Sequence, residues 1–322
     1  MKSLISIIVP VYNEEENIAA CYSAMSELSA ELSAYEFEFI FTDNHSSDET
    51  FSKLRDLHAI DERIRVYRFS KNYGYQRSIM TGYLHARGDA VVQLDCDLQD
   101  PPQMIKEFLA KWELGYKVVY GVRKDREEGK AINLLRKIFY RTIGFLGREK
   151  IPNDAGDFRL VDRALIDHLR QINDGNPYIR GMIHQLGYKQ IGIGYARRAR
   201  EAGESKFDSR ALIGLAIDAL FNHTDFPLRA SAYFGIFVAV LTLIGSILYI
   251  GVKSVGGEDW PAGFATIVVI LLFSTSFNAL FLGILGEYVG RIYSHQKNFP
   301  LTTIESSLES ETPPDRTAQS AK

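Results

Sequence analysis

Short apolar runs alternate with amphipathic segments through the first part of the chain. The runs are rich in β-branched and aromatic residues, which is typical of buried strands. We expect strands at 4–11, 36–42, 64–68, 90–94 and 117–122. Helices are expected from the first strand to about Ala34, up to Leu57, and at 76–87 and 103–114. Strands that alternate with helices predict an α/β fold with a mostly parallel, doubly wound sheet.

Two later apolar stretches are much longer than the strands. Residues 230–252 and 261–286 contain no charged side chain, and each exceeds the roughly 20 residues that cross a bilayer. We therefore predict a two-helix transmembrane hairpin within residues 229–290, with spans at about 230–252 and 262–286. Buried core helices are the alternative, which two uncharged stretches joined by so short a loop disfavour.

The charges around this hairpin predict its orientation. Arg229 precedes the first span, and Arg291 and Lys297 follow the second, whereas the loop 253–260 carries one lysine beside two acidic residues. The positive-inside rule then places both termini in the cytoplasm, with the hairpin in the inner or plasma membrane. Small glycine residues in the spans permit packing between protomers, so a homo-oligomer is compatible with the sequence.

The remaining segments complete the expected domain organisation. Residues 1–208 form a cytoplasmic domain, 209–228 a juxtamembrane interfacial helix, and 291–322 a cytoplasmic tail that is largely disordered after 300. Residues 131–147 read as a basic amphipathic helix suited to an anionic membrane surface, with a core helix as the alternative.

Composition excludes several classes of function. The net charge is −3 and the pI is near 6.2, so no overall basic field points to nucleic acid. Cys21 and Cys96 are far apart and lack metal-ligand spacing, so neither a disulfide framework nor a zinc site is expected. The first residues lack the pattern of a signal peptide.

Acidic side chains follow several of the predicted strands. Asp95 and Asp97 end the strand at 90–94 and are two residues apart, which predicts two carboxylates on one side. Open α/β sheets bind ligands at the carboxyl ends of their strands. A divalent cation that holds a diphosphate suits such a pair; two solvated aspartates in a turn are the alternative. Glu14 and Asp43 follow two further strands, although Asp43 could equally cap a turn.

Dinucleotide and P-loop sites are disfavoured, because no GxGxxG follows the first strand and no GxxxxGK[ST] occurs. Instead, seven segments in order resemble motifs of family 2 glycosyltransferases of the GT-A fold, and more narrowly of the polyprenyl-phosphate glycosyltransferases. They read SIIVPVYNEEENI, TDNHSSDET, KNYGYQRSIMTGYLHARGD, QLDCDLQDPP, NDAGDFRLVDR, REAGESK and GEYVGRIY. The resemblance extends to about Pro300. That group includes bactoprenol glucosyltransferases and dolichol-phosphate mannose synthases.

This resemblance implies an inverting transfer of a sugar from UDP or GDP to a membrane polyprenyl phosphate, with UDP-glucose and undecaprenyl phosphate favoured. It implies Mg²⁺ or Mn²⁺ held by Asp95, Asp97 and Gln99, with Asp97 counted as catalytic. The positions matching the nucleotide site are Pro10, Tyr12, Glu14, Asp43 and Asp95. Those matching the acceptor-phosphate site are Arg123, Arg200 and Lys206. Asp157 matches a general base or acceptor-aligning carboxylate, with Asp154 as the alternative.

One loop departs from the family pattern. After Asp43 the family usually has a second aspartate and a glycine, where this chain has Asn44 and His45. The loss of one carboxylate from this loop affects which nucleotide the protein is expected to prefer. Two alternatives therefore stay open: the same fold with another nucleotide sugar or a glycan or glycolipid acceptor, and a non-enzymatic membrane scaffold.

Overall fold

The computed structural model describes residues 2–123, 155–172, 174–175, 177–196, 264–296 and 300–309, with parts of 231–244. The chain divides into two compact units. The first comprises Met1–Glu128, Ile151–Glu204 and Asn298–Lys322, and the second comprises Gly129–Lys150 and Ser205–Lys297. The predicted helices at 131–147 and 209–228 lie outside the described residues.

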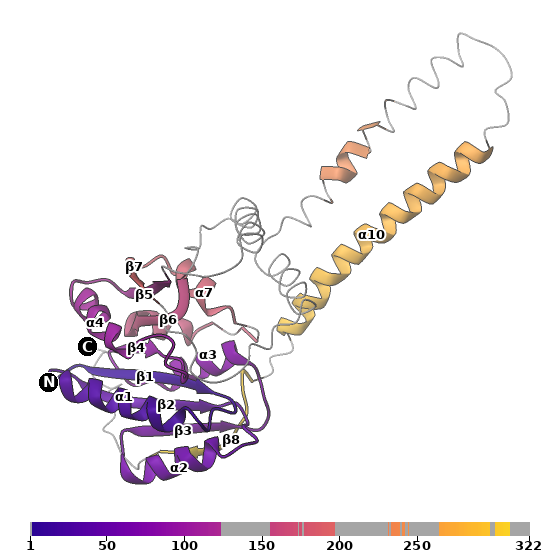
Figure 1. The fold of residues 1–322 in the computed structure, drawn as a ribbon. Coiled ribbons are helices and arrows are strands. Elements are labelled where there is room, and N and C mark those ends of the chain that lie inside the picture. Colours follow the sequence, from indigo (N-terminus) through magenta and orange to yellow (C-terminus); the bar gives the residue numbers. More distant parts are fainter. Residues whose placement is uncertain are drawn as a thin grey trace, which may run out of the picture. The chain divides into compact units, whose positions relative to one another are not determined.

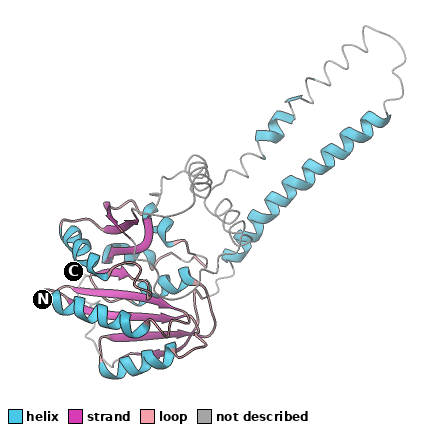
Figure 2. Ribbon diagram, in the orientation of Figure 1, coloured by secondary structure: helices cyan, strands magenta, loops and turns pink. Residues whose placement is uncertain are grey.

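The first unit contains one sheet, in which the described strands run in the order β7-β5-β6-β4-β1-β2-β3-β8 (Figures 1 and 2). Their bounds are β1 Leu4–Val11, β2 Glu36–Asp43, β3 Ile64–Phe69, β4 Ala90–Gln93, β5 Val118–Arg123, β6 Ala155–Asp162, β7 Gln190–Tyr195 and β8 Ile304–Leu308. The central strands β4, β1, β2 and β3 are parallel, whereas β6 and β8 are antiparallel to their neighbours. This arrangement confirms the predicted α/β class with a mostly parallel sheet.

Helices cover both faces of this sheet. On one face lie α1 (Ile18–Glu31), α2 (Thr50–Ile60) and α4 (Ile105–Glu113, preceded by the 3₁₀ turn η1, Pro102–Met104). On the other lie α3 (Tyr75–His85), α6 (Arg163–Leu169) and α7 (Ile179–Gln185). Ile7 and Ile8 of β1 enter opposite cores. Because β1 is buried on both faces, its sequence is apolar on both faces apart from Ser6 and does not alternate with polar residues.

The central strand is shorter than predicted. β4 ends at Gln93, so Asp95 and Asp97 lie in the loop after it and not on one face of a strand. The N–H of Leu94 still donates to the Ile8 carbonyl at 3.0 Å. The chain then turns, and Leu98 adopts a left-handed φ of 52°. The pairing of the two aspartates therefore comes from a tight loop, not from the strand pleat.

The prediction of a largely disordered segment after residue 300 is wrong for residues 304–308. These residues form β8, which pairs with the edge strand β3. Ile304 and Leu308 pack against the two cores, while Glu305 faces solvent. The Ser/Thr/Glu-rich composition of the tail hides this short alternating strand.

The second unit contains helix α10, Phe264–Gln296. Phe234, from the partly described segment 231–244, stacks on Phe277 of α10 with ring centroids 4.7 Å apart. Among the described residues, the structure shows no helix with both the length and the apolar character needed to cross a membrane. Most of the first predicted span, 230–252, lies outside those residues.

Candidate active site

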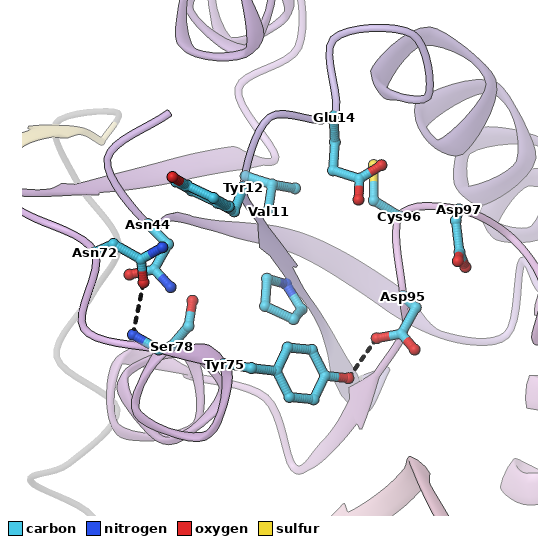
Figure 3. A pocket seen from close by; sticks show the side chains of 12 residues that line it. Val11, Tyr12, Glu14, Asn44, Asn72, Tyr75, Ser78, Asp95, Cys96 and Asp97 are labelled. Atoms are coloured by element: carbon cyan, nitrogen blue, oxygen red, sulfur yellow. Dashed lines mark hydrogen bonds between the residues drawn. The ribbon is translucent and has the colours of Figure 1, made fainter. Parts of the chain in front are cut away.

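A pocket opens at the carboxyl edge of the sheet, in the first unit (Figure 3). Its walls come from the ends of parallel neighbouring strands β1, β2 and β4 and from the start of α3, the edge where open α/β sheets bind ligands. The lining residues are Pro10, Val11, Tyr12, Glu14, Asn44, Asn72, Gly74, Tyr75, Ser78, Asp95, Cys96 and Asp97. The pocket thus brings together five of the predicted site residues.

Asp95 lies at the centre of an acidic group. The Tyr75 hydroxyl donates to Asp95 Oδ1 at 2.5 Å (Figure 3). Gln93 Nε2 donates to the same oxygen at 2.8 Å. Burial first, and then the negative charges of neighbouring aspartates, raise the pKa of Asp95 to about 6 against the opposing effect of the Tyr75 hydrogen bond. Carboxylates crowded in this way are stabilised by a cation between them.

The residues present fit a divalent ion that also binds a diphosphate. Asp95 and Asp97 both face the pocket, and Mg²⁺ usually takes one or two carboxylates together with substrate phosphates. Gln99 is buried and does not line the pocket; its N–H donates to Asp97 Oδ1 at 3.2 Å. Within the part of the chain that the structure describes, no group of three or more His, Cys, Asp or Glu side chains could hold a metal.

The loop after β2 forms the other side of the pocket. Asp43 is fully buried behind the lining, and its Oδ1 accepts the Ser46 N–H at 2.9 Å. Its Oδ2 accepts no hydrogen bond from the described residues and lies 3.5 Å from Arg68 Nη1. Asn44 lines the pocket instead, and its Oδ1 accepts the Tyr73 N–H at 2.8 Å.

His45 explains how the loop tolerates its departure from the family pattern. Its φ is 63°, in the left-handed region where glycine is the default residue. Its Nδ1 lies 2.9 Å from the Phe69 carbonyl oxygen. This conformation costs a non-glycine residue roughly 1–2 kcal/mol, which the contacts of the His45 side chain offset in part.

Arg123, predicted to bind the acceptor phosphate, is part of a buried network. Its Nη2 lies 3.5 Å from Asp100 Oδ2, and its Nε donates to the Tyr195 hydroxyl at 3.3 Å. Tyr195 in turn donates to Asp100 Oδ1. The structure thus holds Arg123 in place beside the acidic group. The other predicted phosphate-binding residues, Arg200 and Lys206, lie outside the described residues, as does Asp154.

Asp157 lies at the start of β6 and pairs with a cation that the sequence did not single out. Its Oδ1 is 3.3 Å from Arg180 Nε on α7. The negative charge of Asp157 contributes to the raised pKa of both Asp95 and Tyr75, so it lies within their electrostatic range. The structure therefore brings Asp157 near the acidic group.

Sequence reasoning missed Tyr75 and Arg180. The sequence offered one local sign of Tyr75, because it directly follows Gly74. Glycine readily adopts a positive φ, and Gly74 has a φ of 92° at the start of α3. Arg180 had none, since its approach to Asp157 depends on the packing of α7. The N–H of Ile179 donates to Gln76 Oε1 at 3.3 Å and thereby ties α7 to α3.

Comparison with known proteins gives a consistent result. Residues 6–170 match the sequence family "Glycosyl transferase family 2". The chain is 35% identical over 306 residues to the uncharacterized glycosyltransferase YkcC of Bacillus subtilis (strain 168), covering 94% of this chain and 93% of that one. It is 34% identical over 305 residues to the bactoprenol glucosyl transferase of Shigella phage SfII, covering 94% and 98%.

A solved structure with a more distant similarity is that of the mannosyltransferase PcManGT from Pyrobaculum calidifontis in complex with GDP-Man and Mn²⁺. The two share 16% identity with a TM-score of 0.49, over 91% of this chain and 85% of that one. This similarity is too weak to support an argument about the site.

Proposed function

Because the chain belongs to glycosyltransferase family 2, we propose that its acidic pocket binds a nucleotide sugar and that the enzyme loads a lipid phosphate with that sugar. The favoured reaction is transfer of glucose from UDP-glucose to undecaprenyl phosphate, with inversion at the anomeric carbon. Relatives that carry the name bactoprenol glucosyl transferase, 34% identical over nearly the whole chain, support this choice.

The crowding of carboxylates around Asp95 is the observation that carries the proposal. A diphosphate alone would be repelled by this acidic edge, whereas a diphosphate with Mg²⁺ or Mn²⁺ would neutralise it. Asp95 and Asp97 would hold the ion, with Gln99 supporting the loop. When bound, the ion stabilises the negative charge that develops on the departing nucleotide diphosphate.

The loop after β2 would form the nucleoside end of the pocket. Asn44 lines the pocket there, and Asp43 is buried directly behind it. Uracil and guanine each present a ring N–H that a side-chain oxygen of this loop could accept, which agrees with UDP or GDP as the leaving group. Pro10, Tyr12 and Glu14 form the adjoining wall, where the base and ribose would lie.

The acceptor brings its own negative charge to the reaction. A phosphate monoester is already anionic at neutral pH, so it must be bound and aimed more than deprotonated. Its oxygen attacks the anomeric carbon, the bond from that carbon to the nucleotide β-phosphate oxygen breaks, and the nucleotide diphosphate leaves. Asp157 would align the acceptor, and Arg123, Arg200 and Lys206 would bind its phosphate through charge-assisted hydrogen bonds.

A lipid acceptor requires that the enzyme work at the membrane surface, so we place it at the inner or plasma membrane with the catalytic unit and both termini cytoplasmic. Helix α10 supports this placement, because large apolar side chains are exposed along it. Ile270, Leu271, Phe273, Leu282 and Ile292 are each more than half exposed. An apolar surface of this extent needs lipid or protein to cover it.

Incubation of the full-length protein with labelled UDP-glucose, Mn²⁺ and a short polyprenyl phosphate tests the proposal. We expect label in the lipid phase that depends on both the metal and the acceptor. UDP-N-acetylglucosamine and GDP-mannose serve as matched donors: transfer from one of these in place of UDP-glucose would correct the sugar. Absence of transfer from every donor would favour a scaffold and overturn the enzyme assignment.

A further inference from the structure

Strand β8 connects the end of the chain to the nucleotide side of the pocket. The N–H of Ser70 donates to the Thr303 carbonyl at 2.9 Å, and the hydroxyls of Thr302 and Thr81 lie 2.9 Å apart. These contacts dock the segment that leads into β8 onto β3 and α3. Both elements run directly into residues that line the pocket, Asn72 and Ser78 among them.

Arg68, the residue of β3 nearest the pocket with a charged side chain, is shared between β8 and the loop after β2. Its Nη1 lies 3.5 Å from Asp43 Oδ2, and its Nε lies 3.6 Å from Glu305 Oε2 on β8. Its Nη2 donates to the Ser46 carbonyl at 3.3 Å, and its guanidinium stacks over the Phe51 ring at 4.6 Å. The guanidinium thus lies between the carboxylates of Asp43, from the first part of the chain, and Glu305, from its last part.

Glu305 makes a second contact to the same loop. Its Oε2 lies 3.6 Å from Nδ1 of His45, the residue held at positive φ in the loop that replaces the family's usual sequence. Asp43, His45 and Ser46 are therefore all linked to β8, directly or through Arg68.

From this arrangement we propose that Glu305 is a positioning residue of the donor site: through Arg68 and His45 it holds the loop after β2 in place, and with that loop Asn44, which lines the pocket. This inference rests on the proposed function, since it takes the pocket as the nucleotide site. Without the Glu305 charge, Arg68 keeps its contacts to Asp43 and Ser46, but the ion-pair contacts that link the loop to β8 are lost. The terminal strand then acts as part of the donor site and not only as an edge of the sheet.

Glu309, the residue that directly follows β8, offers a matched control. It pairs with Arg65 and Arg87, 3.3 and 3.0 Å away, and these side chains lie at the opposite, amino end of the parallel strands. Each of the substitutions Glu305→Gln and Glu309→Gln removes one carboxylate and keeps an isosteric amide. Only the first change alters the surroundings of Arg68.

The test is binding of UDP, and separately of GDP, to the full chain in the presence of Mn²⁺, measured by calorimetry. We expect Glu305→Gln to raise the Kd of the preferred nucleotide about threefold to tenfold, the size of effect of one perturbed hydrogen bond to a charged group. Glu309→Gln should leave Kd unchanged. In an Arg68→Gln background, Glu305→Gln should have a smaller effect than in the wild type, because one of its two links to the loop is already lost. Equal Kd values for the two single variants would overturn the proposal.

Hydrogen exchange of the protein without nucleotide separates this proposal from the proposed function. Glu305→Gln should change the exchange of residues 43–48, whereas Glu309→Gln should change it only near the amino ends of the strands. An unaltered 43–48 loop in Glu305→Gln would overturn the positioning role even if nucleotide binds. A wild type that binds neither nucleotide would overturn the proposed function and the ligand named here, whatever the exchange shows.

Discussion

The amino and carboxyl ends of the parallel strands differ in how far the protein neutralises its own buried charges. At the amino end, Glu38 is buried and fully satisfied: Arg65 Nη1 lies 2.9 Å from its Oε2, and Ser6 Oγ and the Arg87 N–H donate to its Oε1 at 2.5 and 2.6 Å. Glu309 adds a second carboxylate that faces Arg65 and Arg87. Acidic and basic groups therefore balance there.

At the carboxyl end, acidic groups gather around Asp95 and raise its pKa to about 6, with burial as the main cause. Two described cations on this side, Arg123 and Arg180, are engaged with Asp100 and Asp157. The contrast teaches that the amino end is built for stability, because its charges are neutralised by the protein itself. The carboxyl end leaves a charge for a ligand to neutralise, which is typical of a functional site.

The largest effect is expected from Asp97→Asn. Loss of this carboxylate should lower turnover at least about 100-fold, comparable to removal of one group that stabilises transition-state charge. The melting temperature should stay the same or rise, since the change relieves repulsion among like charges. Sugar-transfer assays and thermal unfolding of the same preparation measure both quantities. Wild-type turnover in this variant would disprove the metal-binding role of Asp97.

Glu38→Ala tests the opposite end of the sheet. It leaves the buried Arg65 without its main carboxylate partner, which costs about 3–5 kcal/mol of unfolding free energy. Turnover per folded molecule should remain close to that of the wild type, because Glu38 lies away from the pocket. Denaturant unfolding gives the first quantity and an assay normalised to folded protein gives the second. A stable Glu38→Ala protein with reduced turnover would reverse the distinction drawn between the two ends.

Arg180→Gln should have an intermediate effect. It removes the cation that lies 3.3 Å from Asp157 Oδ1, so we expect kcat/KM for the acceptor to fall about tenfold, as for the loss of one close, partly buried ion pair. Binding of UDP and Mn²⁺ should be retained. Arg170→Gln is the control, because Arg170 pairs with Asp167 at 2.9 Å on the surface of α6. Equal losses in the two variants would argue against a role for Arg180 beside Asp157.

Much of the contrast could be predicted from the sequence, because parallel strands carry their carboxyl ends to one edge. That rule alone brings Glu14, Asp95 and Asp97 to one pocket. It does not decide which of two consecutive residues faces the pocket, and here Asn44 lines it while Asp43 is buried behind it. That choice depends on how β2 ends and on the left-handed turn at His45.

The contacts made by distant segments could not be predicted. β8 is a strand of five residues in a polar tail, and its partner β3 lies near the other end of the sequence. No local pattern connects Glu305 to Arg68 or Arg180 to Asp157, because each pair forms only when separate elements pack together. These tertiary contacts distinguish the two ends of the sheet more clearly than the motifs do.

The smallest predicted effect concerns Glu309, at the balanced end. Burial alone would raise the pKa of its carboxyl, but a hydrogen bond with Tyr67 and the charges of Arg65 and Arg87 outweigh burial and lower the pKa from its ordinary value of 4.5. A carboxyl whose pKa is lowered on folding contributes stability above its unfolded pKa and loses that contribution as the pH falls through its folded pKa.

Glu309→Gln should therefore reduce the unfolding free energy at pH 7 by less than about 1 kcal/mol, the range of partly exposed ion pairs. Its difference from the wild type should shrink as the pH falls below 4.5 and vanish once the wild-type carboxyl is protonated. Denaturant unfolding between about pH 3 and pH 7 measures this difference. A gap that stays constant over the whole range would mean that Glu309 acts through packing and not through its charge, which would weaken the view that charge balance stabilises this end of the sheet.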